Sequence, residues 1–123
     1  MSHDPDCLFC KIVAGTIPSK KVHEDEHIFA FHDIHPAAEV HFLIIPRKFI
    51  PTLADVQPED AALLGHMLAL APVLARQEGL TDGFRTVINT GRMGRQDVYH
   101  LHIHVFGNRP GGDALKTMAG PTG

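Results

Sequence analysis

Residues 100–106 of the chain read His-Leu-His-Ile-His-Val-Phe, so three histidines alternate with apolar residues. Successive side chains of a β-strand point to opposite faces, and the pattern predicts three imidazoles on one face with Leu101, Ile103 and Val105 on the other. Neighbouring imidazoles would lie about 6.6 Å apart at the usual rise per residue. Imidazole acts as nucleophile, acid or base near neutral pH, so three on one face indicate chemistry and not packing alone.

The length, composition and charge of the whole chain limit the functions that this strand can have. Its 123 residues, 44% of them hydrophobic and 20% charged, suffice for a single soluble domain, residues 1–123, with one core. The net charge of -3 gives no reason to expect nucleic acid or a membrane surface as partner. Residues 1–6 are too polar for a signal peptide and no apolar stretch is long enough to span a membrane, so we expect a cytoplasmic protein. Cys7 and Cys10 alone cannot form a disulfide framework.

Periodicity and turn residues predict an α+β fold, with an antiparallel sheet, one long helix and a short N-terminal helix. Gly15 should end the short helix, and Pro72 should kink the long helix or split off its last turn. The predicted elements are a helix over 8–14, a hairpin within 20–34, a strand over 41–46, a helix over 58–78, and strands over 84–89 and 98–106.

A metal site is the main chemical alternative for the three histidines. Histidines two residues apart on a strand can share one zinc ion. The outer two of three alternating residues lie about 13 Å apart, so one metal can take two of these histidines but not all three. Chemistry at phosphorus can use all three.

Residues 100–106 resemble the signature of the histidine triad (HIT) superfamily of nucleotide hydrolases and transferases. Further segments are similar to its Hint branch, namely Phe31-His32-Asp33-Ile34, His41-Phe42-Leu43-Ile44-Ile45-Pro46, Asn89-Thr90-Gly91 and Gln96-Asp97-Val98-Tyr99. The resemblance covers a core of about residues 7–109 and leaves a tail, 110–123. It implies a HIT-like fold, a homodimer whose two sheets join into one, and hydrolysis of nucleoside phosphoramidates or acyl-nucleotides.

The resemblance also implies roles for individual residues. His102 would be the nucleophile that attacks the α-phosphorus, His104 would contact the phosphate or the leaving group, and His100 would hold the local network. His41 would work beside His100. A purine nucleotide or nucleotide conjugate would bind at the residues that match the family's nucleotide-binding segments: Phe9, Ile12, Phe31, Asp33, Ile34, Leu43, Asn89 and Gln96. Among these, Asp33 would accept hydrogen bonds from the ribose, and Asn89 and Gln96 would contact the reacting phosphate.

The chain departs from the family pattern at three places. Asp97 stands where Hint-like proteins often have a serine, and we include it as a catalytic candidate because a carboxylate could pair with a leaving amine. Cys7-x-x-Cys10 resembles a zinc half-site that His100 and a second histidine complete, but Phe49 stands at that second position. We therefore expect no cofactor and no bound metal. The tail is of the bacterial type and lacks the Trp-Pro-Pro-Gly ending of the animal branch, which leaves the leaving group open.

The leading hypothesis is an adenosine phosphoramidase-like hydrolase. Within the superfamily, a dinucleoside polyphosphate hydrolase or nucleotidyl transferase is the alternative. Two other classes of function also fit the residues. One is a non-catalytic nucleotide-binding regulatory module, and the other is a metal-binding module that uses Cys7, Cys10 and His100.

Overall fold

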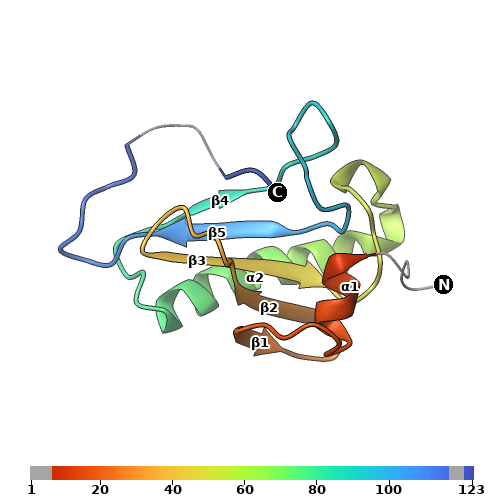
Figure 1. Ribbon diagram of the computed structural model, residues 1–123, viewed down its shortest axis with the longest axis horizontal. Coiled ribbons are helices and arrows are strands. Elements are labelled where there is room, and N and C mark those ends of the chain that lie inside the picture. The colour runs from red at the N-terminus through yellow and green to blue at the C-terminus, as the bar shows by residue number, and fades with distance from the viewer. Residues whose placement is uncertain (1–6, 117–120) are drawn as a thin grey trace.

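The computed structural model describes residues 7–116 and 121–123, and they form a five-stranded antiparallel sheet with helices on both faces (Figure 1). The strands lie in the order β1-β2-β3-β5-β4, so β3 is the central strand. Their bounds are β1 Lys21–Glu24, β2 Ile28–His32, β3 Val40–Pro46, β4 Arg85–Val87 and β5 Ile103–Gly107, and the helices are α1 Leu8–Val13 and α2 Ala61–Gln77, with 3-10 turns at Leu53–Asp55 and Pro58–Asp60. The predicted α+β class is confirmed.

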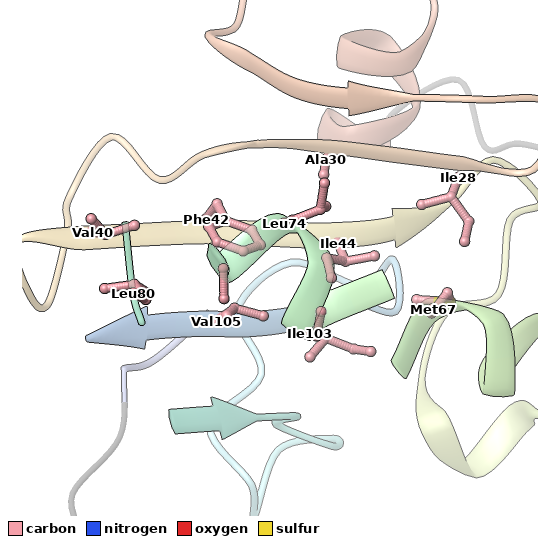
Figure 2. Packing of buried hydrophobic residues seen from close by; sticks show 12 residues of the cluster. Ile28, Ala30, Val40, Phe42, Ile44, Met67, Leu74, Leu80, Ile103 and Val105 are labelled. Atoms are coloured by element: carbon pink, nitrogen blue, oxygen red, sulfur yellow. The ribbon is translucent and has the colours of Figure 1, made fainter. Parts of the chain in front are cut away.

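Helix α2 covers one face of the sheet and closes the main hydrophobic core. Alternate residues of β3 and β5 point to this face, where Phe42 and Val105 are fully buried beneath Leu74 (Figure 2). The alternation follows from the two-residue period of a strand and assigns every second residue to α2. The core cluster is Ile28, Ala30, Val40, Phe42, Ile44, Met67, Ala71, Leu74, Ala75, Leu80, Ile103 and Val105.

The opposite face of the sheet carries α1 and the remaining residues of β3 and β5. The Cys7 sulfur caps α1 by accepting from the Cys10 amide, and Gly15 follows the helix in a left-handed conformation with φ of 81°. A second buried cluster lies under α1 and contains Cys7, Phe9, Cys10, Ile12, Phe29, Phe31, Leu43 and Ile45. This face is therefore the one that receives His41 and the histidines of residues 100–104.

The long helix does not split at Pro72, one of the two outcomes expected there, and the expected start of the last strand is wrong. The long helix is not split at Pro72, because the carbonyl that proline leaves without a donor belongs to Leu68, on the exposed side of α2, where water can bind it. The last strand starts at Ile103 and not at residue 98. The register pairs Ile44 with Ile103 and would place Leu101 opposite Pro46, but the Pro46 carbonyl accepts from the His100 ring and Pro46 has no N–H to donate to Leu101, while the Leu101 amide donates to the Ile50 carbonyl (2.7 Å).

The strand expected over 84–89 is shorter, at Arg85–Val87, and the expected hairpin is confirmed as β1 and β2. Among the helices of the described residues, none combines the length and the apolar character needed to cross a membrane.

Candidate active site

The three histidines of residues 100–104 lie on the α1 side of the sheet and are all buried. Their exposed fractions are 0% for His100, 2% for His102 and 1% for His104. The His102 and His104 ring centroids are 5.0 Å apart, and the Phe9 ring of α1 meets the His102 ring edge-on at 5.0 Å. The rings thus gather on one face, although only His104 belongs to the regular part of the strand.

The hydrogen bond of His102 determines which of its nitrogens carries the proton. Its Nδ1 lies 2.7 Å from the main-chain oxygen of His100. Because a carbonyl only accepts, Nδ1 donates and Nε2 of the neutral ring keeps its lone pair. This Nε2 is buried and has no hydrogen-bond partner among the residues that the structure describes. An imidazole with a fixed, free lone pair is prepared for nucleophilic attack.

A chain of hydrogen bonds fixes the opposite arrangement in His104. The Ala37 amide donates to Nδ1 of His41 (2.9 Å), so the hydrogen of neutral His41 is on Nε2. This Nε2 lies 3.0 Å from Nδ1 of His104 and donates to it. His104 therefore accepts at Nδ1 and carries its hydrogen on Nε2, which is also buried and unpaired within the described part of the chain. The neighbouring rings thus present a lone pair on His102 and an N–H donor on His104.

His41 lies against His104 and not beside His100, which corrects the expectation from the sequence. The two residues belong to adjacent strands, β3 and β5, and the register places Leu43 opposite His104, so His41 meets it diagonally. The Asp33 carboxylate adds an anionic contact, 3.5 Å from Nε2 of His41. Its other oxygen accepts from the His35 amide (2.8 Å).

Burial keeps these rings neutral. Removal from water, together with the neighbouring rings of His102 and His41, lowers the pKa of His104 to about 3. Burial also lowers the pKa of His102, although its bond to the His100 carbonyl, the nearby main chain of Gly123 and the charges of Asp33 and Asp97 oppose the shift. The pKa values of His41 and His100 are lowered by burial as well. At neutral pH the lone pair of His102 is therefore available without prior deprotonation.

The ring of His100 faces the sulfur atoms of Cys7 and Cys10. Its Nε2 donates to the Pro46 carbonyl (2.7 Å), so Nδ1 keeps a lone pair that points to the sulfurs of Cys7 at 3.2 Å and Cys10 at 3.3 Å. The structure pairs the two cysteines with each other as a disulfide, with Cα atoms 5.2 Å apart, so only the reduced form can donate a proton or bind a metal. As a thiol, Cys7 has a pKa raised to about 12 by burial and by its contact with Cys10, so it can donate its proton to His100.

The sulfur cluster fits three of the ligands of a soft metal ion. The ligand atoms of Cys7, Cys10 and His100 lie within 4.8 Å of one another, and the Pro46 carbonyl orients His100 as an outer partner of a metal ligand would. A structural zinc site needs a fourth donor. The ring of Phe49, 5.6 Å from the His100 ring, takes that side of the cluster and offers none.

Asp33, His41 and His104 also bring three ligand atoms within 4.8 Å of one another. A metal on Nε2 of His41 would require the hydrogen of that ring to move to Nδ1. The Ala37 amide already donates to Nδ1, so the surroundings of His41 keep the ring hydrogen on Nε2 and disfavour a metal there.

The loop that follows β4 reaches the histidines through residues 89–96. Gln96 is buried and holds the loop from inside: its oxygen accepts from the Gly91 amide, and its Nε2 donates to the Pro51 and Val98 carbonyls. Gly94 is required because a Cβ there would lie 2.5 Å from the Thr90 oxygen. The predicted phosphate contact Gln96 is thus engaged in shaping the loop.

Asn89 directs its amide nitrogen to the last residues of the chain. Its Nδ2 donates to the main-chain oxygen of Pro121 at 2.7 Å and lies 3.4 Å from that of Gly123. The Gly123 amide donates in turn to the Arg95 carbonyl (3.3 Å). Segment 121–123 therefore lies at the histidines, a placement that the sequence analysis did not predict.

The residues predicted to bind the nucleoside differ widely in their exposure. Phe9, Ile12, Phe31 and Leu43 are buried together under α1, whereas Ile34 is 86% exposed. A cavity of about 320 Å³ lies elsewhere, and its lining includes none of the predicted residues. It is bounded by residues 82–85, 107–109 and 112–115.

Asp97 is exposed and makes no side-chain hydrogen bond or ion pair with any described residue, yet its charge acts on His102. Sequence reasoning missed the main-chain groups that set the protons, namely the carbonyls of His100 and Pro46 and the Ala37 amide. Their residue types carry no signal of this role.

Comparison with known proteins finds a matching family model, similar sequences and similar solved structures. A family model described as "Scavenger mRNA decapping enzyme C-term binding" matches residues 6–119. The chain is 50% identical over 102 residues to Protein HitA of Neisseria gonorrhoeae, covering 83% of this chain and 95% of that protein. It is 46% identical over 111 residues to the purine nucleoside phosphoramidase of Escherichia coli K12, covering 89% and 93%. A HIT family hydrolase from Legionella pneumophila superposes with a TM-score of 0.82 at 45% identity, covering 96% of this chain and 100% of that one.

Proposed function

This chain belongs to the histidine triad (HIT) family of hydrolase-type nucleotide-binding proteins, and we propose that it cleaves purine nucleoside 5'-phosphoramidates or acyl-nucleotides to the nucleoside monophosphate. The observation that carries the proposal is the pairing of two neutral rings, one with a free lone pair on His102 and one with a free N–H on His104. A named phosphoramidase among the relatives supports the choice of substrate.

In the first step Nε2 of His102 attacks the α-phosphorus and the bond from phosphorus to the leaving nitrogen or oxygen breaks. A proton from solvent joins the leaving group, and the nucleotidyl group stays on His102 as an imidazolium whose Nδ1–H donates to the His100 carbonyl. The N–H of His104 donates to the phosphoryl oxygens, where negative charge grows in the transition state. Asp97 pairs with a leaving amine as it takes up its proton.

In the second step water attacks the phosphorus and the bond to Nε2 breaks. The electron pair returns to Nε2, one water proton goes to solvent, and the nucleoside monophosphate departs. His41 keeps His104 in the same tautomer through both steps, since the Ala37 amide stays on its other nitrogen.

The nucleoside would bind beside β2, with Asp33 accepting from the ribose hydroxyls and the residues around Phe9 and Ile34 flanking the base. We propose a cytoplasmic homodimer in which the sheets of two copies join. The sheet order supports this proposal because it leaves strands β1 and β4 at the edges of the described fold. Light scattering on the purified protein tests the dimer.

The decisive experiment is to trap the intermediate. Adenosine phosphoramidate labelled at phosphorus is mixed with the protein, the reaction is quenched within milliseconds, and the labelled residue is located by mass spectrometry. We expect label on His102, release of adenosine monophosphate, and loss of both in His102→Ala. His27→Ala is the matched control, because His27 is exposed and far from the triad strand in sequence. Full turnover in His102→Ala would contradict the mechanism.

The alternatives are tested with the same protein. Turnover of dinucleoside polyphosphates in preference to phosphoramidates would favour the polyphosphate hydrolase or transferase. Tight binding of adenosine monophosphate without turnover of any conjugate would favour a regulatory module.

A further inference from the structure

Segment 121–123 covers the two nitrogens that the proposed chemistry needs. A Cβ placed on Gly123 would lie 3.8 Å from Nε2 of His104 and 4.0 Å from Nε2 of His102, so the main chain itself is close to both. Figure 1 shows the end labelled C beside β4 and the connection that leads to β5. Both rings are almost completely buried in this arrangement. A nucleophile in that state cannot meet a phosphorus atom.

The contacts of this segment are those that a phosphate would need. Asn89 donates to the main-chain oxygens of Pro121 and Gly123, and oxygen acceptors are also what a phosphoryl group presents. The Nε2–H of His104 is a second donor at the same place. Segment and substrate would therefore compete for the Asn89 donor and for the space in front of the His104 N–H, which the segment covers without accepting from it.

The facing loop meets the segment at a residue with a strained backbone. Arg95 has a φ of 63°, the one positive φ among non-glycine residues in the described part of the chain, and its carbonyl accepts from the Gly123 amide. Such a conformation is unfavourable for a residue with a Cβ. Gly123 has a φ of 121°, which a larger residue adopts only with strain.

We infer that segment 121–123 is an autoinhibitory strap, which occupies the phosphoryl subsite and must leave before a nucleotide binds. The inference rests on the proposed function for the identity of the displaced ligand. The main chain of the strap is held by hydrogen bonds to Asn89 and Arg95, and the Thr122 side chain is exposed. Water or a ligand can replace these few hydrogen bonds when the strap leaves. A strap docked in nine of ten molecules would raise the apparent KM about 10-fold, because only the undocked fraction binds substrate.

The first test does not depend on turnover. Diethyl pyrocarbonate acylates accessible neutral imidazoles, and mass spectrometry follows the rate at each histidine. In a chain that ends at Lys116 we expect acylation of His102 and His104 to be about 10-fold faster than in the full chain. His27 and His35 are exposed and serve as internal controls whose rates should not change. Equal rates at His102 and His104 in both chains would overturn the strap.

Point variants keep the test open if the shortened chain folds poorly. Gly123→Val strains the docked conformation and should reproduce the faster acylation, whereas Thr122→Ala, at an exposed position, should behave as the full chain. Both are compared with the full chain by circular dichroism. Unchanged acylation in a folded Gly123→Val would also overturn the inference.

Turnover then separates the two proposals. With adenosine phosphoramidate, the chain ending at Lys116 should show a KM about 5- to 10-fold lower with kcat little changed. Faster acylation without turnover in either chain would support the strap and contradict the hydrolase. Turnover with an equal or higher KM in the shorter chain would contradict the strap and leave the hydrolase intact.

Discussion

His100 and His104 sit at the two ends of the same short segment, on the same face and equally buried, but their surroundings differ completely. His100 has both nitrogens engaged, one by the Pro46 carbonyl and one by the sulfurs of Cys7 and Cys10. His104 has one nitrogen engaged by His41 and the other left without a partner in the described structure. The residue type is therefore not what makes one end reactive. The unpaired nitrogen is what marks the reactive end.

The unpaired nitrogens of His102 and His104 carry a free-energy cost that His100, which lies beside Cys7 and Cys10 at the sulfur end of the segment, avoids. A buried polar group without a hydrogen bond destabilises a fold by about 1–3 kcal/mol. His102 and His104 both present such an atom, at neighbouring positions. A fold optimised only for stability would satisfy them, so their presence indicates that a ligand completes the set.

The largest contrast in activity is expected between substitutions of His102 and of His100. We expect His102→Gln to lower kcat for adenosine phosphoramidate by about 10⁴-fold or more, because the nucleophile is lost. His100→Gln should cost less than about 10²-fold, because His102 is held by the main-chain oxygen of residue 100 and not by its ring. Steady-state kinetics of the two variants measures the contrast. Equal losses would show that the His100 ring takes part in the chemistry.

The second prediction concerns the proton on His104. His41→Leu removes the donor to Nδ1, so His104 loses its fixed tautomer and we expect kcat to fall about 10²-fold with little change in KM. His41→Gln keeps an N–H donor at the same reach and should recover about 10-fold of this loss. Thermal unfolding of both variants serves as the control for folding. Identical kcat values for the two variants would refute the assignment of the tautomer.

Acid should lower the free energy of unfolding mainly through protonation of His104. Burial lowers the pKa of His104 to about 3 from an unfolded value of 6.5, so between these values the unfolded chain binds one proton more. Stability is therefore full above pH 6.5 and falls as the pH falls, by about 2 kcal/mol between pH 6.5 and pH 5 from this group alone.

Urea unfolding at several pH values measures this slope. His104→Gln should flatten it more than His100→Gln, since burial also lowers the pKa of His100 but its bond to the Pro46 carbonyl opposes the shift. His27→Gln, at an exposed position, should leave the slope unchanged. An unaltered slope in His104→Gln would contradict the neutral state of that ring.

Much of the fold could be predicted from local patterns. The glycine stop of α1, the apolar run of β3 and the proline and acidic start that precede α2 are all local signals, and these elements are present. The common face of the histidines follows from alternation and is also present. The family resemblance is confirmed by the comparisons.

The partners of the histidines could not be predicted in the same way. His41 and His104 are 63 residues apart in sequence, and only the register of β3 against β5 makes them neighbours. The proton positions depend on carbonyls and one amide, which every residue has. Along residues 100–102 the ladder ends because the Pro46 carbonyl pairs with the His100 ring and the Leu101 amide pairs with Ile50, tertiary contacts that a single-strand pattern does not contain.

The smallest effect on activity is expected at the sulfur end, from removal of metal. Cys7, Cys10 and His100 supply three donors and Phe49 withholds the fourth, so we expect well under one zinc ion per purified chain and less than about a twofold change in kcat after chelation. Phe49→His supplies the missing donor and should raise the zinc content to about one per chain, measured by elemental analysis, while Phe49→Leu should not. One tightly held zinc ion in the unaltered protein would show that three ligands suffice, and that the two ends differ by a metal as well as by a hydrogen bond.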